Sequence, residues 1–341
     1  MTPTKKIAAV AIALIAPALV ACQSGGGAAS PAAPAGSPAG SAPASAPAKQ
    51  LNITFVQGVI GDNFYITMEC GMRDAVAKAG NIKLDVQGPQ TWDASLQQPI
   101  VTAVVAKKPD ALLIAPNDVQ AMQAPLKNAA DAGIKVGLVD TTVNDPSFAF
   151  TQISSDNEGG GKAAFEALKK LLPDGGQVMV IDHTPGISTT DARTKGFEEA
   201  VKADSKFEYV GKQYAQNDPA KAAGFVTSMY QKYPNLKGIF ATNLFSATGA
   251  ATGIRQANAV GKIKVVAFDA GPDQVKALQE DTVQALVAQK PFDIGSQAIA
   301  QAIKAVNGEA TTPTIQTGST IITKDMLGTP AGDQAVYLSK C

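Results

Sequence analysis

The stretch IKVGLVD at residues 134–140 shows the pattern on which the fold is built, because it is a short run rich in β-branched residues that an aspartate closes. Runs of the same kind lie earlier, at 51–56 (LNITFV), 83–87 (KLDVQ) and 111–115 (ALLIA), with amphipathic segments of helical length between them. Short strands that alternate with such segments indicate βαβ units and a parallel sheet. The sequence therefore predicts an α/β fold.

The second half of the chain repeats the first in its details. KKPDALLIAPN at 107–117 corresponds to KYPNLKGIFATN at 232–243, and IKVGLVD corresponds to IKVVAFD at 263–269. Two such repeats in the same order predict two similarly wound domains.

Polar or aromatic residues follow several of the predicted strands. Asp140 and Asp269 end the two IKV runs, Asn243 follows GIFAT, and the loop 61–65 follows the first run. Open parallel sheets bind ligands beyond the carboxyl ends of their strands. If the two domains face each other, we expect these side chains to converge on one cleft.

The N-terminal region has the profile of an export signal. Residues 1–21 contain a basic start, an apolar core too short to span a bilayer, and small residues at the end. LVAC at 19–22 resembles the lipobox of bacterial lipoproteins, which implies cleavage before Cys22 and lipidation of its thiol. A plain secretory signal with a chance cysteine is the alternative. Residues 22–50 are almost wholly Ala, Pro, Gly and Ser, so we expect a tether without a core.

Composition and motifs limit which partners and cofactors the protein is expected to bind. The chain has 341 residues, a formal net charge of zero, three cysteines and one histidine. The length allows two domains with their own cores, and the charge balance offers no basic surface for nucleic acid. His183 has no acidic or cysteine cluster at ligand spacing, so we expect a loop residue near the cleft and no metal. EGGGKA at 158–163 departs from the phosphate-loop pattern and is predicted to begin a helix, so no cofactor is expected.

From residue 51 to 324 the chain resembles the periplasmic sugar-binding proteins of ABC transporters, of the ribose/galactose type. The motifs that carry the resemblance occur in order along the chain: DNFYITMECG (62–71), KPDALLIAP (108–116), SSDNEGGGKAA (154–164), RTKGFEEAV (193–201), IFATN (239–243), VVAFDAGPD (265–273) and LVAQKPFDIG (286–295). The resemblance implies two Rossmann-like lobes with parallel sheets, joined by a three-strand hinge (periplasmic binding protein type I). It assigns 51–155 with 290–317 to the N-terminal lobe, 156–289 with 319–324 to the C-terminal lobe, and 325–341 to a C-terminal tail.

The resemblance also implies a ligand site. Paired aromatic residues of the family's first loop flank the sugar ring, which transfers to Phe64 and Tyr65, because the C–H face of a sugar packs on an aromatic ring. The family's carboxylate and amide positions suit vicinal hydroxyl groups. They match Asp62, Asp140, Asn243, Asp269 and Gln289.

The chain departs from the family at several positions of this site. Thr141 and Asp191 stand where ribose-type members have arginines, and Asn217 stands where an aromatic residue often caps the site. Arg193 is the remaining nearby arginine, and its family equivalent more often braces the loop than touches the sugar. We keep all four as candidate ligand-binding residues. The departures favour a neutral sugar or polyol other than ribose.

Ordinary structural roles are the alternatives for these residues. Phe64 and Tyr65 could belong to the core of the first helix, and Asp140 and Asp269 could form turns. Trp92 could stack on a ligand at the rim of the cleft, although we favour a staple that packs on its own helix.

Cys70 and Cys341 are the cysteines of the predicted body. Cys70 lies two positions from Met68, on roughly the opposite face from the helix's apolar stripe, so we expect it to be partly exposed. Outside the cytoplasm an exposed thiol tends to find a partner. We therefore predict a Cys70–Cys341 disulfide that fastens the tail 325–341, with pairing between two chains as the alternative.

These features predict a monomeric receptor that is lipid-anchored at the extracytoplasmic face of the cell membrane. It would capture a neutral sugar or polyol by hinge closure and deliver it to an ABC transporter permease, without catalysis. A sensor that presents bound sugar to a signalling partner shares the fold and stays open as an alternative. A secreted carbohydrate-active enzyme is less favoured, because it would need two carboxylates placed across one glycosidic bond.

Overall fold

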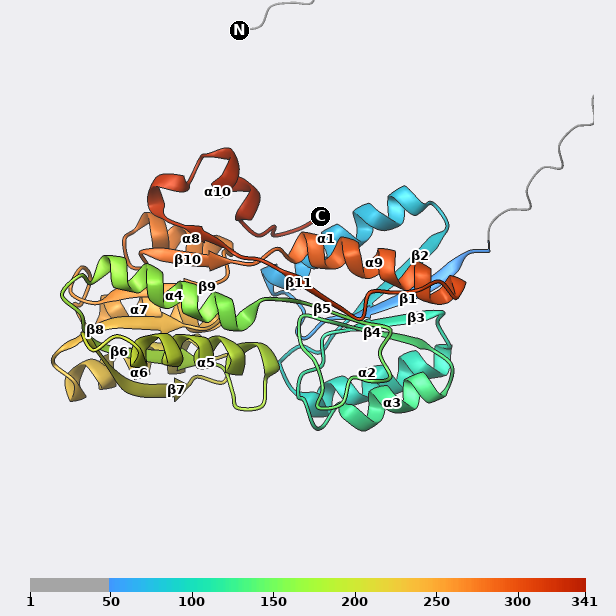
Figure 1. Cartoon of the computed structure of the whole chain (residues 1–341), viewed down its shortest axis with the longest axis horizontal. Helices are drawn as coiled ribbons and strands as arrows, with labels where there is room; N and C mark the ends of the chain where they lie inside the picture. The colour runs from blue at the N-terminus through green and yellow to red at the C-terminus, as the bar shows by residue number, and fades with distance from the viewer. Residues whose placement is uncertain (1–48) are drawn as a thin grey trace, which may run out of the picture. The chain divides into compact units, whose positions relative to one another are not determined.

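Two sheets organise the part of the chain that the structure describes. The computed structural model describes residues 49–341, so the predicted signal 1–21, Cys22 and the tether up to residue 48 lie outside the described residues. Each sheet has six strands and forms one α/β lobe (Figure 1). No helix within 49–341 is long and apolar enough to cross a membrane.

The first lobe is built on a parallel sheet with strand order β11-β5-β4-β3-β1-β2. Its elements come from two separate stretches of the chain: β1 (Leu51–Val56), α1 (Asn63–Ala79), β2 (Ile82–Gln87), α2 (Ala94–Lys107), β3 (Ala111–Ile114), α3 (Gln123–Asp131), β4 (Lys135–Val139) and β5 (Thr151–Ser155), then α9 (Pro291–Asn307) and β11 (Thr314–Thr317).

The second lobe has strand order β12-β10-β9-β8-β6-β7, in which only β12 runs antiparallel to its neighbour. Its elements are α4 (Asn157–Leu171), β6 (Gly176–Asp182), α5 (Ser188–Lys202), β7 (Phe207–Tyr214), α6 (Pro219–Lys232), β8 (Leu236–Ala241), α7 (Leu244–Gln256), β9 (Lys264–Phe268), α8 (Pro272–Gln279), β10 (Ala285–Ala288) and β12 (Thr320–Ile322). The chain passes between the lobes after β5, after β10 and between β11 and β12.

The sequence repeats correspond to equivalent strands of the two lobes. β3 and β8 carry the first repeat, β4 and β9 carry the second, and each pair occupies the same place in its sheet. The predicted α/β fold with two similarly wound units is therefore confirmed.

Helices cover both faces of each sheet. In the first lobe α1 pairs with α9 on one face and α2 with α3 on the other, while in the second lobe α4 pairs with α5 and α6 with α7 (Figure 1). One apolar core runs through both lobes and includes Phe64 and Tyr65 of α1 together with Tyr337 of the tail. Aromatic residues of α1 and of the tail therefore belong to the same apolar core as residues of the second lobe.

Two glycines let α1 and α9 approach closely. A Cβ atom at Gly71 would collide with the carbonyl oxygen of Phe292, and one at Gly295 would collide with that of Met68. A backbone carbonyl within a packed helix cannot turn aside as a flexible side chain can. The contact therefore fixes α1, which carries the aromatic pair, against the helix that begins at the second crossover.

Aspartate side chains cap the starts of several helices. Asp93 accepts a hydrogen bond from the Ser95 amide at the start of α2, and Asp218 accepts from two amides at the start of α6, where Pro219 is the first residue. Asp156 accepts from the Gly159 amide, so the segment EGGGKA lies in the first turns of α4 rather than in a phosphate loop.

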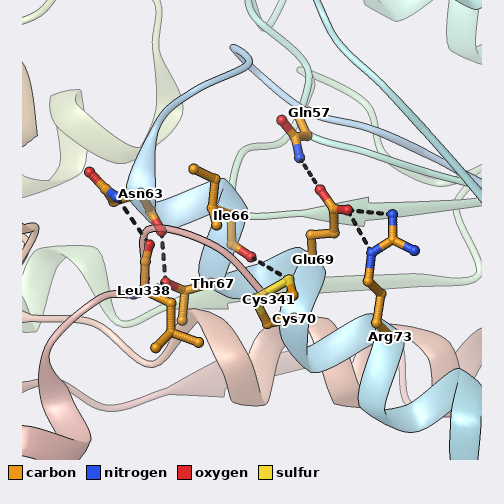
Figure 2. The surroundings of a disulfide bond; sticks show 9 residues. All are labelled: Gln57, Asn63, Ile66, Thr67, Glu69, Cys70, Arg73, Leu338 and Cys341. Atoms are coloured by element: carbon orange, nitrogen blue, oxygen red, sulfur yellow. Dashed lines mark hydrogen bonds and ion pairs between the residues drawn. A yellow bond between two sulfur atoms is a disulfide. The ribbon is translucent and has the colours of Figure 1, made fainter. Parts of the chain in front are cut away.

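The C-terminal tail returns to the first lobe. After the 3-10 turn η1 (Lys324–Met326) and the short helix α10 (Pro330–Ala335), Cys341 forms the predicted disulfide with Cys70 of α1 (Figure 2). The predicted exposure of Cys70 is wrong, since the residue is only 6% exposed. The reason is that the first two turns of α1 are buried on several faces, not along one stripe.

Candidate ligand-binding site

A small cavity of about 40 Å³ lies between the lobes, beyond the carboxyl ends of both sheets. Its lining comes from both lobes and from the second crossover: Asp62, Phe64, Tyr65, Trp92, Asp140, His183, Ile187, Thr189, Thr190, Arg193, Asn217, Asn243, Asp269 and Gln289. The strand-end side chains therefore converge as expected.

Asp140 and Asp269 occupy equivalent places in the two lobes. Both have a left-handed backbone, with φ of 63° and 78°. Their amides donate across to the next strand, to Ile153 O at 2.8 Å and to Val287 O at 2.9 Å. Aspartate adopts this region more readily than most residues, so the strand can end in a sharp turn that carries a carboxylate.

Each of the three carboxylates of the cavity has one oxygen bound to the protein. Asp62 Oδ1 accepts from the Phe64 amide at 2.8 Å, and Asp140 Oδ2 accepts from the Tyr65 hydroxyl at 2.7 Å. Asp269 Oδ1 accepts from Gln289 Nε2 at 2.6 Å. The second oxygen of each carboxylate has no hydrogen-bond partner within residues 49–341, so each group is oriented by one oxygen and can accept from a ligand with the other.

Burial changes how two of these carboxylates titrate. Desolvation, with a contribution from the charge of Asp269, raises the pKa of Asp62 to about 7. Desolvation raises the pKa of Asp140 to about 6, against the opposing charge of Arg193. Part of the acceptors of the cavity are therefore protonated near neutral pH, and hydroxyl donors from a ligand would favour the ionised form.

The aromatic residues form a continuous wall. Phe64 meets Tyr65 edge to face at 5.2 Å, and Tyr65 lies nearly parallel to Trp92 at 6.3 Å between ring centroids. Phe64 and Tyr65 are both core residues and lining residues, so the two interpretations of them hold together. The interpretation of Trp92 as a staple is wrong, because its ring stacks on Tyr65 and lines the cavity, and its Nε1 donates to Asn117 O at 2.9 Å.

Arg193 is held firmly at the wall formed by the second lobe. Its Nε donates to Asn157 Oδ1 and its Nη1 to Thr242 O, each at 2.9 Å, while the guanidinium lies 3.8 Å from the centroid of the Phe268 ring. The residue is 3% exposed. These contacts fit the predicted bracing role, and among the described residues Nη2 has no hydrogen-bond partner, so it can donate into the cavity.

Two asparagines meet at the same wall. Asn243 caps α7 with its Oδ1 and donates from Nδ2 to Asn217 Oδ1 at 2.7 Å. Asn217 has a left-handed φ of 59°, which turns it toward this contact after β7. The bond fixes the Asn217 amide so that its Nδ2 is a further donor for a ligand.

Two predicted residues do not line the cavity. Thr141 follows Asp140 but its hydroxyl donates to Pro116 O at 2.7 Å, within the first lobe. Asp191 accepts from the Gly186 amide at 2.9 Å and so stabilises the loop before α5. Neither is positioned as a ligand contact, because each side chain is committed to its own backbone surroundings.

Comparison with known proteins settles the family. Residues 53–310 match the description "Periplasmic binding protein domain". The chain belongs to the periplasmic binding protein family. The ribose import binding protein of Bacillus subtilis (strain 168) is 30% identical over 268 residues, which is 78% of this chain and 85% of that protein. The D-allose-binding periplasmic protein of Escherichia coli (strain K12) is 28% identical over 250 residues, 70% of this chain and 79% of that protein.

A solved structure shows the same arrangement. An ABC transporter solute binding protein from Agrobacterium vitis, bound with alpha-D-tagatopyranose, is 37% identical, with a TM-score of 0.83 over 85% of this chain and all of that one. A second protein from the same organism, with bound D-fucose, is 27% identical, with a TM-score of 0.80 over 84% of this chain and all of that one.

The lobes of this periplasmic binding protein touch each other at the mouth of the cavity. The Thr142 amide donates to Ser188 Oγ at 3.1 Å, and the Val119 amide donates to Gly186 O at 3.4 Å. Trp92 of the first lobe meets His183 of the second edge to face at 5.4 Å. These contacts join the two lobes, and Trp92 and His183 among them also line the cavity.

Several lining residues of this binding protein were missed as ligand contacts. His183 and Thr190 are buried, and neither His183 Nε2 nor Thr190 Oγ1 has a partner among the described residues. Desolvation lowers the pKa of His183 to about 4, so its ring is neutral near pH 7. The place of His183 directly after β6 was the available signal, because the other strand ends also supply the site.

Proposed function

We propose that this protein is the sugar receptor of an ABC importer, which encloses one neutral sugar or polyol between its lobes and presents the closed form to a permease. The family supports a binding role, and the relatives named above are binding proteins for ribose, allose, tagatose and fucose. The observation that carries the proposal is the set of three carboxylates, each held by one oxygen and free at the other.

The donor and acceptor pattern fits a polyhydroxylated ligand. Hydroxyl groups would donate to the free oxygens of Asp62, Asp140 and Asp269, and Arg193 Nη2 and Asn217 Nδ2 would donate to ligand oxygens. The aromatic wall would pack against the apolar face of a sugar ring. Three carboxylates against one guanidinium disfavour an anionic ligand.

Binding would proceed by rotation of the lobes about the three crossovers. We assign 51–155 with 290–317 to one moving unit and 156–289 with 319–324 to the other. Each unit supplies part of the lining, so a ligand makes its full set of contacts only in the closed form and shifts the population toward it. The permease would distinguish the closed form from the open one.

The proposed location follows from the N-terminal sequence. Removal of residues 1–21 and lipidation of Cys22 would anchor the protein at the extracytoplasmic face of the membrane. Replacement of Cys22 by alanine should then abolish incorporation of a labelled fatty acid into the protein, as measured on the immunoprecipitated chain. Absence of label in the wild-type protein, or equal labelling of the variant, would contradict the anchor.

A thermal-shift screen tests the binding function. Purified protein is heated with pentoses, ketohexoses including tagatose, aldohexoses, inositols and sugar alcohols. A ligand at a hundred times its Kd stabilises the folded state by about 2.7 kcal/mol, which raises the Tm measurably. Calorimetric titration of each hit should give one site per chain. No stabilisation by any sugar or polyol would refute the proposal.

A further inference from the structure

The C-terminal tail forms a fourth connection between the lobes. The Tyr337 amide donates to Ala270 O of the second lobe at 2.9 Å. The next residue, Leu338, bonds to α1 of the first lobe: its amide donates to Thr67 Oγ1 at 2.7 Å, and its carbonyl accepts from Asn63 Nδ2 at 3.0 Å (Figure 2). The Cys70–Cys341 disulfide completes this attachment, so the tail is fastened to both lobes.

Tyr337 lies directly behind the cavity. It is 3% exposed, and its ring centroid lies 6.0 Å from that of Phe64. Its hydroxyl donates to Asp269 Oδ1 at 3.1 Å and accepts from the Gln289 amide at 2.9 Å. Burial raises the pKa of Tyr337 well above its ordinary value, so the hydroxyl keeps the proton that it donates.

The Tyr337 hydroxyl belongs to a network that ends at the ligand site. Asp269 Oδ1 accepts from both Tyr337 and Gln289 Nε2, which leaves Oδ2 as the oxygen for a ligand. Gln289 in turn accepts at Oε1 from Ser155 Oγ at 2.7 Å, and these two residues lie at the first two crossovers. Loss of the Tyr337 hydroxyl would therefore alter the hydrogen bonding of the ligand-site carboxylate Asp269 and of Gln289 at the second crossover.

Few noncovalent contacts attach residues 338–341, the end of the tail, to the rest of the protein. Residues 338–341 are exposed, and Leu338 is 42% exposed. Little apolar surface of this segment is buried, so its binding to α1 depends on the few polar bonds and on the disulfide. Without the disulfide the tail could leave α1 and withdraw Tyr337 from Asp269.

We propose that the disulfide-fastened tail is part of the binding site and that Tyr337 is a positioning residue, which orients Asp269 and Gln289 for the ligand. The inference rests on the proposed sugar-binding function, since it concerns the same cavity. Tyr337 does not line the cavity itself, so it acts through Asp269 rather than on the ligand.

The test compares Kd values for a sugar that stabilises the wild-type protein. Tyr337→Phe keeps the ring and removes the hydroxyl, and it should weaken binding by about tenfold or more, because it removes a hydrogen bond to a charged site residue. Replacing both Cys70 and Cys341 by serine should weaken binding by a similar factor. Tyr209→Phe is the matched control, since it removes a tyrosine–carboxylate bond of 2.8 Å to Glu198, away from the cavity, and it should leave Kd unchanged.

Combining the changes separates positioning from general stability. If the disulfide acts through Tyr337, adding Tyr337→Phe to the double serine variant should cost little further affinity, whereas independent effects would multiply. Wild-type affinity in Tyr337→Phe or in the double serine variant would overturn the inference, whatever happens to Tm. If the wild-type protein binds no sugar, the proposed function fails first and the inference fails with it, so the two failures are distinguishable.

Discussion

Replacing Asp140 by asparagine should stabilise the empty protein at neutral pH and at the same time weaken sugar binding. Asparagine has nearly the same shape and tolerates the left-handed φ of 63° at this position, so the strand end should keep its conformation. The two effects have opposite signs because the charge that serves the ligand is unfavourable in the buried, empty site.

The size of the stability effect follows from the pKa of Asp140. Burial raises this pKa from 3.8 to about 6. Because the folded value lies above the unfolded one, stability is lost as pH rises from about 4 to about 6, and it stays lost at pH 7.5. This difference in pKa corresponds to about 3 kcal/mol. The free energy of unfolding of Asp140→Asn, relative to that of the wild type, should therefore be higher at pH 7.5 than at pH 4 by up to about 3 kcal/mol.

The loss of affinity should be larger than an ordinary hydrogen bond would give. A hydrogen bond to a charged group contributes about 1.5–3 kcal/mol, which corresponds to a Kd about 10 to 150 times higher. Urea unfolding at the two pH values measures stability, and calorimetric titration measures Kd. Asp174→Asn, an exposed turn residue, is the control and should change neither quantity. A wild-type Kd in Asp140→Asn, or a stability difference that does not depend on pH, would refute the reasoning.

Three further predictions concern the same cavity. Sugar binding should release protons between about pH 5 and pH 7, because ligand hydroxyls favour the ionised forms of Asp62 and Asp140, whose pKa values are about 7 and about 6. Calorimetric titration in two buffers of different ionisation heat measures the number of protons released. Proton uptake on binding would contradict the prediction. The fluorescence of Trp92, the single tryptophan, should change on sugar binding, because its ring contacts His183 of the other lobe. An unchanged emission spectrum at saturating sugar would argue against closure of the lobes over the ligand. Arg193→Lys should lower the free energy of unfolding by about 2–4 kcal/mol, because lysine cannot replace the two directed hydrogen bonds of Arg193 and its stacking on Phe268. Urea unfolding measures this difference. An unfolding curve identical to that of the wild type would show that the bracing contacts contribute little.

The strand-end residues could be predicted because a parallel sheet places all its carboxyl ends at one edge. Once the apolar runs are located, Asp140, Asn243 and Asp269 must lie at that edge whatever the side-chain packing. The sequence repeats between the two halves predict a second lobe with the same strand order, and hence a second set of strand ends. The same logic would have pointed to His183, which also follows a strand directly.

The direction of a side chain beside a strand end could not be predicted. Thr141 adjoins Asp140 in the chain, yet it bonds to Pro116 O, while Asp140 lines the cavity. Trp92 lies in a loop before α2 and still joins the aromatic wall through Tyr65. Such outcomes depend on which neighbour is near in space, and local sequence does not contain that information.

Strand patterns, repeats and cysteine positions predict the two α/β lobes, the polar cleft between them and a disulfide between two cysteines far apart in the chain. What that disulfide does depends on the tertiary structure, because the path of the tail is set by packing against both lobes. Its return to α1 places Tyr337 behind Asp269, 68 residues away in the chain, where the hydroxyl holds one carboxylate oxygen and leaves the other for a ligand. Hydrogen bonds of this kind depend on distances of about 3 Å, which sequence spacing does not fix.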